Sequence, residues 1–490
     1  MSILDALEPF YRVLPEVKVP EVQPPLKKKI LWSAIALILF FIMGNITVLG
    51  LEASTAGKLE QLQVILASEI GTLITVGIGP IVLASIILQL LVGGGLLKID
   101  LTEPKDKARF TGLQKLLAVI LCFVEAGVYV FSGLLLPVAS SPLIPGISIL
   151  GFLTFNFLVV VLQVALGSII LLYLDEVVSK YGIGSGIGLF IAGGVAGSVF
   201  WRFLNPLNLS GEIAIFGQGT SAAAGLLWQF FSNIPSQGFF ISFVNNMLPF
   251  VFAIIVFLVV VFAEGIHANI PLTVGRGGFK SRFPVKFLYV SNIPVILAVA
   301  LFANIQLWAA IAANVPFIGL FLQKLSTVVI APFGFVETLI TQGISPLVLE
   351  QIIQSIATLQ FIGLGGEIVH AVLYISILTS TCIVFGKFWV EMAGQGPEAV
   401  ANQLQKSGMF IPGFRRDPRI VRKVLDRYIP PITILGAAFV GLLAGFADLT
   451  GALGSGTGIL LTVGIVYRLY EELARAQLME LHPMLGRLFG

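Results

Sequence analysis

The sequence is poor in charge. Only 11% of its 490 residues are Asp, Glu, Lys or Arg, whereas 57% are hydrophobic and the mean hydropathy is +0.98. No soluble globular domain has this composition. The chain is therefore expected to be an all-α polytopic membrane protein.

Residues and motifs that carry enzyme chemistry are also scarce. There is no GxxxxGK[ST], HExxH or GxSxG pattern, the glycine run at 182–188 fits no register of GxGxxG, and the three histidines are scattered. The two cysteines, Cys122 and Cys382, lie in separate apolar runs, where inert packing is favoured over a disulfide or a metal site. We expect no enzyme, no cofactor and no metal.

Apolar runs long enough to cross a bilayer recur along the chain, and about 20 residues suffice for each. Ten are predicted, at 30–49, 71–92, 113–137, 149–174, 183–204, 240–263, 286–307, 367–390, 430–447 and 452–470. The stretch 308–364 is also apolar but is interrupted by Pro, Gly, Lys and Glu. We interpret it as a long external loop with interfacial helices; counting its two pieces as spans would give twelve and leave the parity unchanged.

The basic residues set the orientation, because cytoplasmic segments are enriched in lysine and arginine. With the N-terminus inside, only Lys58, Arg202 and Lys324 of the 29 basic residues fall outside. Both termini are therefore predicted to be cytoplasmic. No cleavable signal peptide is expected at the start, since the first apolar run follows Lys27–Lys29.

The second span does not have the sequence of a simple, uninterrupted transmembrane helix. Gly71, Gly77, Gly79 and Pro80 break its first half, and residues 56–67 before it suggest a short separate helix. Broken backbone at membrane depth requires protein or a water-filled cavity around it. We expect this span to face the interior of a helix bundle.

Polar side chains inside the spans are few. Glu125 lies near the middle of span 3, and Gln89 and Asn292 lie in spans 2 and 7. A carboxylate at membrane depth is by default a candidate functional residue, but an interhelical hydrogen bond that fixes packing explains Glu125 equally well. An ion-coupled transporter usually needs several such carboxylates.

The cytoplasmic loops 264–286 and 391–428 project basic and apolar residues. Two interpretations stay open: orientation bias alone, or a docking surface for a large acidic partner such as ribosomal RNA. The outer loop at 205–238 separates spans 1–5 from spans 6–10, giving halves 1–238 and 239–490. Each half contains five spans, and the two halves start on opposite sides of the membrane. This is the layout of an inverted repeat with a central site or pore.

Five stretches together resemble the SecY family, the large subunit of the protein-conducting channel, in its archaeal form. They are GTLITVGIGPIV with IILQLL in span 2, GIGSGIGLFIAGG in span 5, YVSNIPVIL in span 7, SGMFIPGFRR in the 8/9 loop and GTGILLTV in span 10. The resemblance covers nearly the whole chain, and its poorest part is 308–364.

The resemblance implies an hourglass pore between two inverted halves, closed at the waist by a ring of aliphatic side chains. The matching positions are Ile78, Val82, Ile187, Ile191, Ile296 and Leu461. A narrow apolar ring dewets and offers no ligands, so ions meet a barrier there. Residues 56–67 would form a plug on the outer side of the ring, with Ala56, Gly57, Leu59, Leu62, Ile65 and Leu66.

The resemblance also implies a lateral gate between spans 2 and 3 and spans 7 and 8, with Gln89, Glu125 and Asn292 at or beside it. The chain departs from the family pattern at Leu83, where many relatives carry a hydroxyl residue. Ribosome docking would fall to Arg276, Lys280, Arg282, Arg415 and Arg416.

The implied function is to pass secretory polypeptides across the cell membrane and to release transmembrane segments sideways into lipid. The implied partners are small subunits of the SecE and Sec-beta types, the ribosome, nascent chains that bear signal sequences, membrane lipid and, indirectly, the signal recognition particle receptor. Without the resemblance, composition and topology indicate only a ten-span channel or transporter. A secondary transporter of small solutes is the alternative, and an integral-membrane enzyme ranks third.

Overall fold

The computed structural model describes most of the chain. The described residues are 9, 13–22, 24–51, 68–93, 96–97, 99, 104–138, 155–208, 212–214, 223–274, 279–290, 292–312, 317–333, 335–342, 348–358, 361, 363–406, 409–410 and 418–481. The proposed plug residues 56–67 lie outside these ranges.

Long and short helices make up both halves. The first half contains α2 (Leu26–Asn45), α4 (Gly79–Gly93), α5 (Pro104–Phe131), α6 (Phe155–Tyr181), α7 (Gly186–Leu204) and α8 (Leu226–Gln237). The second half contains α9 (Phe239–Asn246), α10 (Leu248–Gly265), α11 (Ile293–Ile311), α12 (Ile318–Val329), α13 (Phe335–Gln342), α14 (Val348–Thr358), α15 (Gly363–Met392), α16 (Pro397–Lys406), α17 (Pro418–Leu449) and α18 (Gly456–Leu481).

The expectation of an all-α polytopic membrane protein is confirmed. Within the described ranges, six segments are long and apolar enough to cross a membrane: 105–131, 155–181, 186–204, 248–265, 363–405 and 421–449. Shorter apolar helices occupy 79–92, 293–309 and 318–329. Each of the ten expected spans contains a helix, but the count of ten membrane crossings stays a prediction.

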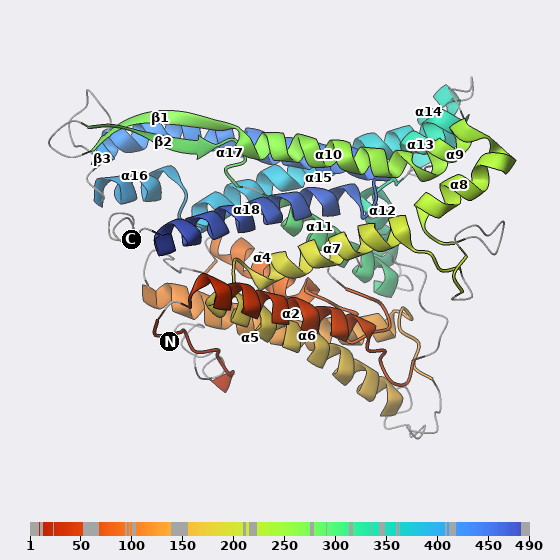
Figure 1. Cartoon of the computed structure of the whole chain (residues 1–490), viewed down its shortest axis with the longest axis horizontal. Helices are drawn as coiled ribbons and strands as arrows, with labels where there is room; N and C mark the ends of the chain where they lie inside the picture. Colours follow the sequence, from red (N-terminus) through yellow and green to blue (C-terminus); the bar gives the residue numbers. More distant parts are fainter. Residues whose placement is uncertain are drawn as a thin grey trace.

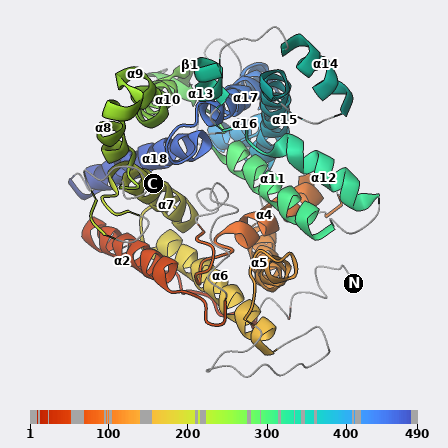
Figure 2. The same ribbon diagram turned by 90° about the vertical axis from the view of Figure 1, so that its right-hand side faces the viewer.

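The two halves face each other across the molecule. Seen along the long axis, α2, α4, α5 and α6 lie in the lower part, and α10, α11, α15 and α17 lie in the upper part (Figure 2). The halves meet on one side through α7 and α18, and on the other side α4 packs against α11 and α15 while α5 packs against α11.

The second span is broken where the sequence predicts. Residues 68–78 form turns, Gly71 and Gly77 have φ values of +90° and +61°, and α4 begins only at Gly79. The broken stretch presses against α6, because a Cβ atom on Gly167 would lie 1.8 Å from the carbonyl oxygen of Leu73. Helix α4 is also shorter than a typical span as a result.

A small sheet forms in the loops that sequence analysis left without structure. Strands β1 (His267–Val274) and β2 (Phe279–Lys286) make an antiparallel hairpin, and β3 (Met409–Phe410) pairs with β1. The contact pairs are Thr273 with Phe410 and Val274 with Met409. The two basic loops are thus joined into one structure.

Short helices fill the two expected outer loops. Helix α8 forms within 205–238, where sequence analysis placed only a loop, and α12, α13 and α14 form within 308–364, where interfacial helices were expected. Figure 1 shows α8, α9, α13 and α14 at the right-hand end of the molecule. The sheet, α16, the start of α2 and the end of α18 lie at the opposite end.

Candidate functional site

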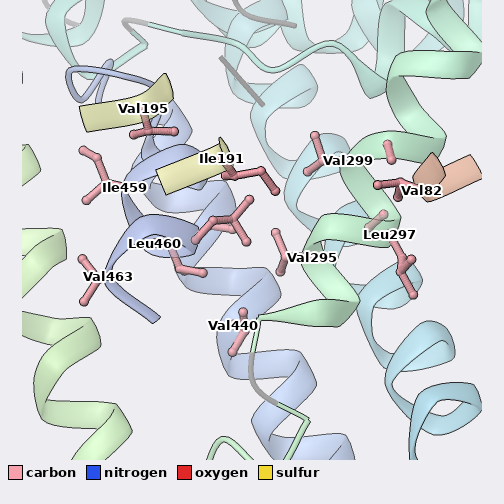
Figure 3. Close-up of a cluster of buried hydrophobic side chains, with 14 of the residues drawn as sticks. Val82, Ile191, Val195, Val295, Leu297, Val299, Val440, Ile459, Leu460 and Val463 are labelled. Carbon is pink, nitrogen blue, oxygen red and sulfur yellow. The ribbon is translucent and has the colours of Figure 1, made fainter. Parts of the chain in front are cut away.

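The six expected ring residues belong to one apolar cluster at the centre of the bundle. Ile78, Val82, Ile191 and Leu461 are at most 5% exposed, and the half-buried Ile187 and Ile296 pack against the same cluster. Figure 3 shows part of it, with Ile191 of α7, Leu460 of α18 and Val82 of α4 among its labelled members. The cluster therefore draws on both halves, although it is larger than a single ring.

Local structure explains how these side chains reach the centre. The N–H of Val82 donates to the carbonyl oxygen of Ile78 at 3.1 Å, so the pair shares one helical turn although α4 starts at Gly79. Ile187 and Ile191 are likewise one turn apart on α7. Side chains at this spacing lie on the same helix face, and both pairs are aliphatic.

The aliphatic character of the six expected ring residues determines what the central cluster can do. Aliphatic side chains offer neither hydrogen bonds nor charge, so a passage closed by them resists water and ions. In the described part of the chain no group of three His, Cys, Asp or Glu could hold a metal ion. Cys122 and Cys382 are buried free thiols, as the sequence predicts.

The three polar residues expected at the gate are all buried, with 3–5% exposure. Gln89 donates to the hydroxyl oxygen of Ser85 on its own helix at 2.9 Å. Asn292 donates to the carbonyl oxygen of Leu460 on α18 at 3.1 Å. Oε1 of Glu125 has no hydrogen-bond partner among the described residues. These two hydrogen bonds do not join the two sides of the expected gate, and the gate role of the trio stays a prediction.

Apolar packing fills the interface where the gate is expected. Helices α4 and α5 contact α11, and α4 also contacts α15. Leu307 of α11 enters the core formed by α5 and α6, where it joins Cys122, Ala126 and Val164. An aliphatic side chain from one half is thus buried in the other.

Two of the five docking residues expected from sequence lie on the small sheet. Lys280 and Arg282 lie on β2, in register with Thr273 and Pro271 of β1. Arg276, Arg415 and Arg416 lie outside the described residues. Because β1 pairs with both β2 and β3, the two basic loops share one platform at the end of the molecule that also holds α16 (Figure 1).

One buried polar residue was not among the site residues expected from the sequence. Asp448, at the end of α17, is 1% exposed and accepts hydrogen bonds from the hydroxyl of Tyr374 at 2.8 Å and the N–H of Thr457 at 2.9 Å. The hydroxyl of Thr457 also donates to it. Asp448 lies near the end of a span, where a carboxylate needs no special explanation. Its partners lie on other helices, α15 and α18, and no local sequence pattern marks them.

Fold and site define a class: a polytopic helical membrane protein whose halves enclose an apolar centre and whose second span is broken beside it. The SecY family model matches residues 72–470, and the model described as the plug domain of Sec61p matches residues 38–71.

Relatives match over nearly the full length. The chain is 43% identical to the protein translocase subunit SecY of Methanocaldococcus jannaschii, with 99% of each chain covered, and 39% identical to that of Pyrococcus furiosus, with 100% of each covered. A solved structure titled "The structure of a protein conducting channel" aligns with a TM-score of 0.75 at 41% identity, covering 97% of this chain and 98% of that one. The chain belongs to the SecY family.

Proposed function

We propose that this chain is the pore-forming subunit of a channel that passes polypeptides across the membrane and releases transmembrane segments sideways into lipid. The observation that carries the proposal is the central cluster, in which aliphatic side chains of α4, α7, α11 and α18 meet. Flexible aliphatic side chains can part for an extended polypeptide and close again behind it, whereas they give ions no ligands. The chain itself would make and break no covalent bond.

The waist of this channel would be Ile78, Val82, Ile187, Ile191, Ile296 and Leu461. Four of the six are almost fully buried, which fits a seal. The plug would be supplied by residues 56–67, and the match of the plug-domain model to residues 38–71 supports a plug in this part of the chain.

The sideways exit would open between α4 and α5 on one side and α11 and α15 on the other. Helices of the two halves touch here, and Leu307 of α11 packs among apolar side chains of α5 and α6. Apolar contacts separate at little electrostatic cost, and an emerging helix gains about 0.3–0.6 kcal/mol for each Leu, Ile, Phe or Val that reaches lipid.

The small sheet and its basic loops would dock the ribosome on the cytoplasmic side. Positive side chains attract RNA phosphate regardless of sequence, and a relative's structure is titled "Sec61 in the Canine ribosome-channel complex from the endoplasmic reticulum". Small subunits of the SecE and Sec-beta types would complete the channel. We place both termini in the cytoplasm and the protein in the cell membrane, from the distribution of lysine and arginine.

A site-directed crosslink tests the proposal. Cys122 and Cys382 are replaced, one cysteine is introduced as Ile78→Cys, and a secretory chain with a single cysteine is stalled on a ribosome. A disulfide that forms only with the engaged chain is the expected result, since the polypeptide must pass the waist.

The matched control places the cysteine at Ile120, which is 50% exposed on the outer face of α5. No disulfide at Ile78 from any position along the nascent chain, despite stable engagement, would contradict the proposed path. Saturable uptake of a small solute by the same preparation would favour a transporter.

A further inference from the structure

Two helices that carry ring residues begin with the same local sequence. The pattern Gly-Ser-Gly-Xaa-Gly occupies 184–188 before and at the start of α7, and it recurs at 454–458 at the start of α18. Relative to Ser185 and Ser455, the ring residues Ile191 and Leu461 occupy the same position. The two helices belong to opposite halves of the chain.

The two helix starts share a serine cap and the conformation of the preceding glycine, although the serines themselves differ, with φ −101° at Ser185 and +58° at Ser455. The hydroxyl oxygen of Ser185 accepts from the N–H of Gly188 at 3.4 Å, and that of Ser455 accepts from the N–H of Gly458 at 3.0 Å. Serine in this role satisfies one of the free N–H groups of the first turn. The glycine before each serine has a left-handed φ, +70° at residue 184 and +78° at residue 454.

A carboxylate from the preceding helix binds each start. Oδ1 of Asp175, on α6, accepts from the N–H of Ile187 at 2.8 Å, and Oδ1 of Asp448, on α17, accepts from the N–H of Thr457 at 2.9 Å. Ile187 and Thr457 are the matching positions of the pattern. Negative charge at a helix N-terminus is favourable because the free N–H groups carry partial positive charge.

Tight packing holds each carboxylate in place. A Cβ atom on Gly186 would lie 2.5 Å from Cα of Asp175, and one on Gly456 would lie 2.0 Å from the carbonyl carbon of Ala447, the neighbour of Asp448. The first turn of α7 thus touches the backbone of α6, and that of α18 touches the backbone of α17. A shift of either ring helix would break the hydrogen bonds and open this contact.

We infer that Asp175 and Asp448 are paired positioning residues, each of which fixes the first turn of a ring helix and thereby the height of Ile191 or Leu461 at the waist. Asp448 does more than Asp175, since the hydroxyl of Tyr374 ties it to α15, a helix of the expected gate. The inference rests on the proposed function, because it assigns the carboxylates to the seal of that channel.

The test uses the full chain with Asp175→Ala, Asp448→Ala and the isosteric Asp175→Asn and Asp448→Asn. Hydrogen exchange reports the helix starts: losing a charged acceptor is expected to speed exchange at the N–H groups of Ile187 and Thr457 by about 10- to 100-fold. Ion conductance of the resting protein in planar bilayers reports the seal, and each alanine variant is expected to leak. The asparagine variants, which keep an acceptor oxygen, are expected to leak less.

Two controls give the outcomes their meaning. Asp426→Ala removes a half-exposed carboxylate of α17 that lies 3.9 Å from Arg422, and it is expected to change neither readout. Ile191→Gly removes a ring side chain and is expected to leak. Where an alanine variant does not fold, its asparagine counterpart decides by the same two readouts.

Faster exchange at both helix starts with the conductance of the parent would overturn the inference, since the carboxylates would then stabilise the helices without setting the seal. The proposed function would survive this result, provided that Ile191→Gly leaks. If Ile191→Gly also keeps the parent's conductance, the ring itself is wrong, and the inference falls with it.

Discussion

Asn292 fills the space that a side chain at residue 464 would need. A Cβ atom on Gly464 of α18 would lie 1.8 Å from Nδ2 of Asn292, and the same nitrogen donates to the carbonyl oxygen of Leu460 at 3.1 Å. The side chain of Asn292, just before α11, is therefore held against α18, one turn beyond Leu461, a residue of the proposed ring. This polar residue thus joins two elements of the second half, and its expected place at the gate stays a prediction.

Gly464→Ala is expected to destabilise the protein. The added methyl group displaces Asn292 and breaks its hydrogen bond, and overpacking of this kind costs about 1–3 kcal/mol. Thermal unfolding in detergent measures the effect. Gly127→Ala is the matched control, because nothing lies within 4 Å of a Cβ at this position of α5. Equal melting temperatures for the two variants would contradict the close approach.

Removing the waist is expected to make the resting channel leak. The triple variant of Ile78, Ile187 and Ile296 to Gly takes three aliphatic side chains out of the central cluster, and the dry barrier to ions is lost with them. Conductance in planar bilayers is the measurement. Three isoleucines that are 44–50% exposed, Ile120, Ile170 and Ile254, are replaced by Gly in the control, which is expected to stay tight.

The fold could be predicted where the signal is local. Apolar runs give the helices, and Gly71, Gly77 and Pro80 give the break before α4, because these residue types act on their own backbone. The pairing of β1 with β3 could not be predicted, since it joins residues far apart along the chain with no repeat or spacing to mark them. Helix α8 was missed because its surroundings are rich in turn-forming residues.

The candidate site divides in the same way. The burial of the ring residues follows from family motifs, whereas the partners of Asn292 and Asp448 depend on how α11, α15 and α18 are placed. Leu460 accepts the hydrogen bond from Asn292 through its backbone carbonyl. Every residue has such a carbonyl, so the amino-acid sequence cannot indicate which one is the partner. The plug residues, Arg276, Arg415 and Arg416 stay predictions from the resemblance.

Arg415→Glu is expected to weaken ribosome binding by about tenfold or more, since a phosphate contact is replaced by repulsion. Binding of purified ribosomes at several salt concentrations measures both the affinity and its salt dependence, which should flatten. Lys18→Glu, a charge reversal at an exposed residue near the N-terminus, is the control. Equal losses for both variants would mean that the loop serves orientation only.

Glu176 holds the N-terminal segment against the bundle. Its carboxylate on α6 accepts from Nζ of Lys115 at 2.7 Å, Nζ of Lys180 at 2.9 Å and the N–H of Val17 at 3.2 Å. Lys115 also donates to the carbonyl oxygen of Pro15 at 2.6 Å. These side chains are only 15–18% exposed, so solvent screens them less than surface pairs.

Glu176→Ala is therefore expected to release residues 13–22. Lys115 loses its carboxylate partner, Lys180 keeps Glu16 at 3.1 Å, and the N–H of Val17 loses its acceptor. The cost is about 1–3 kcal/mol, so the segment detaches more often. Limited trypsin digestion measures this as faster cleavage after Lys18, identified by the mass of the fragment. Glu398→Ala breaks an ion pair with Arg422 whose side chains are 52–65% exposed, and such pairs contribute about 0–1 kcal/mol. That control should leave cleavage after Lys18 unchanged, and an equally unchanged rate in Glu176→Ala would show that other contacts hold the segment.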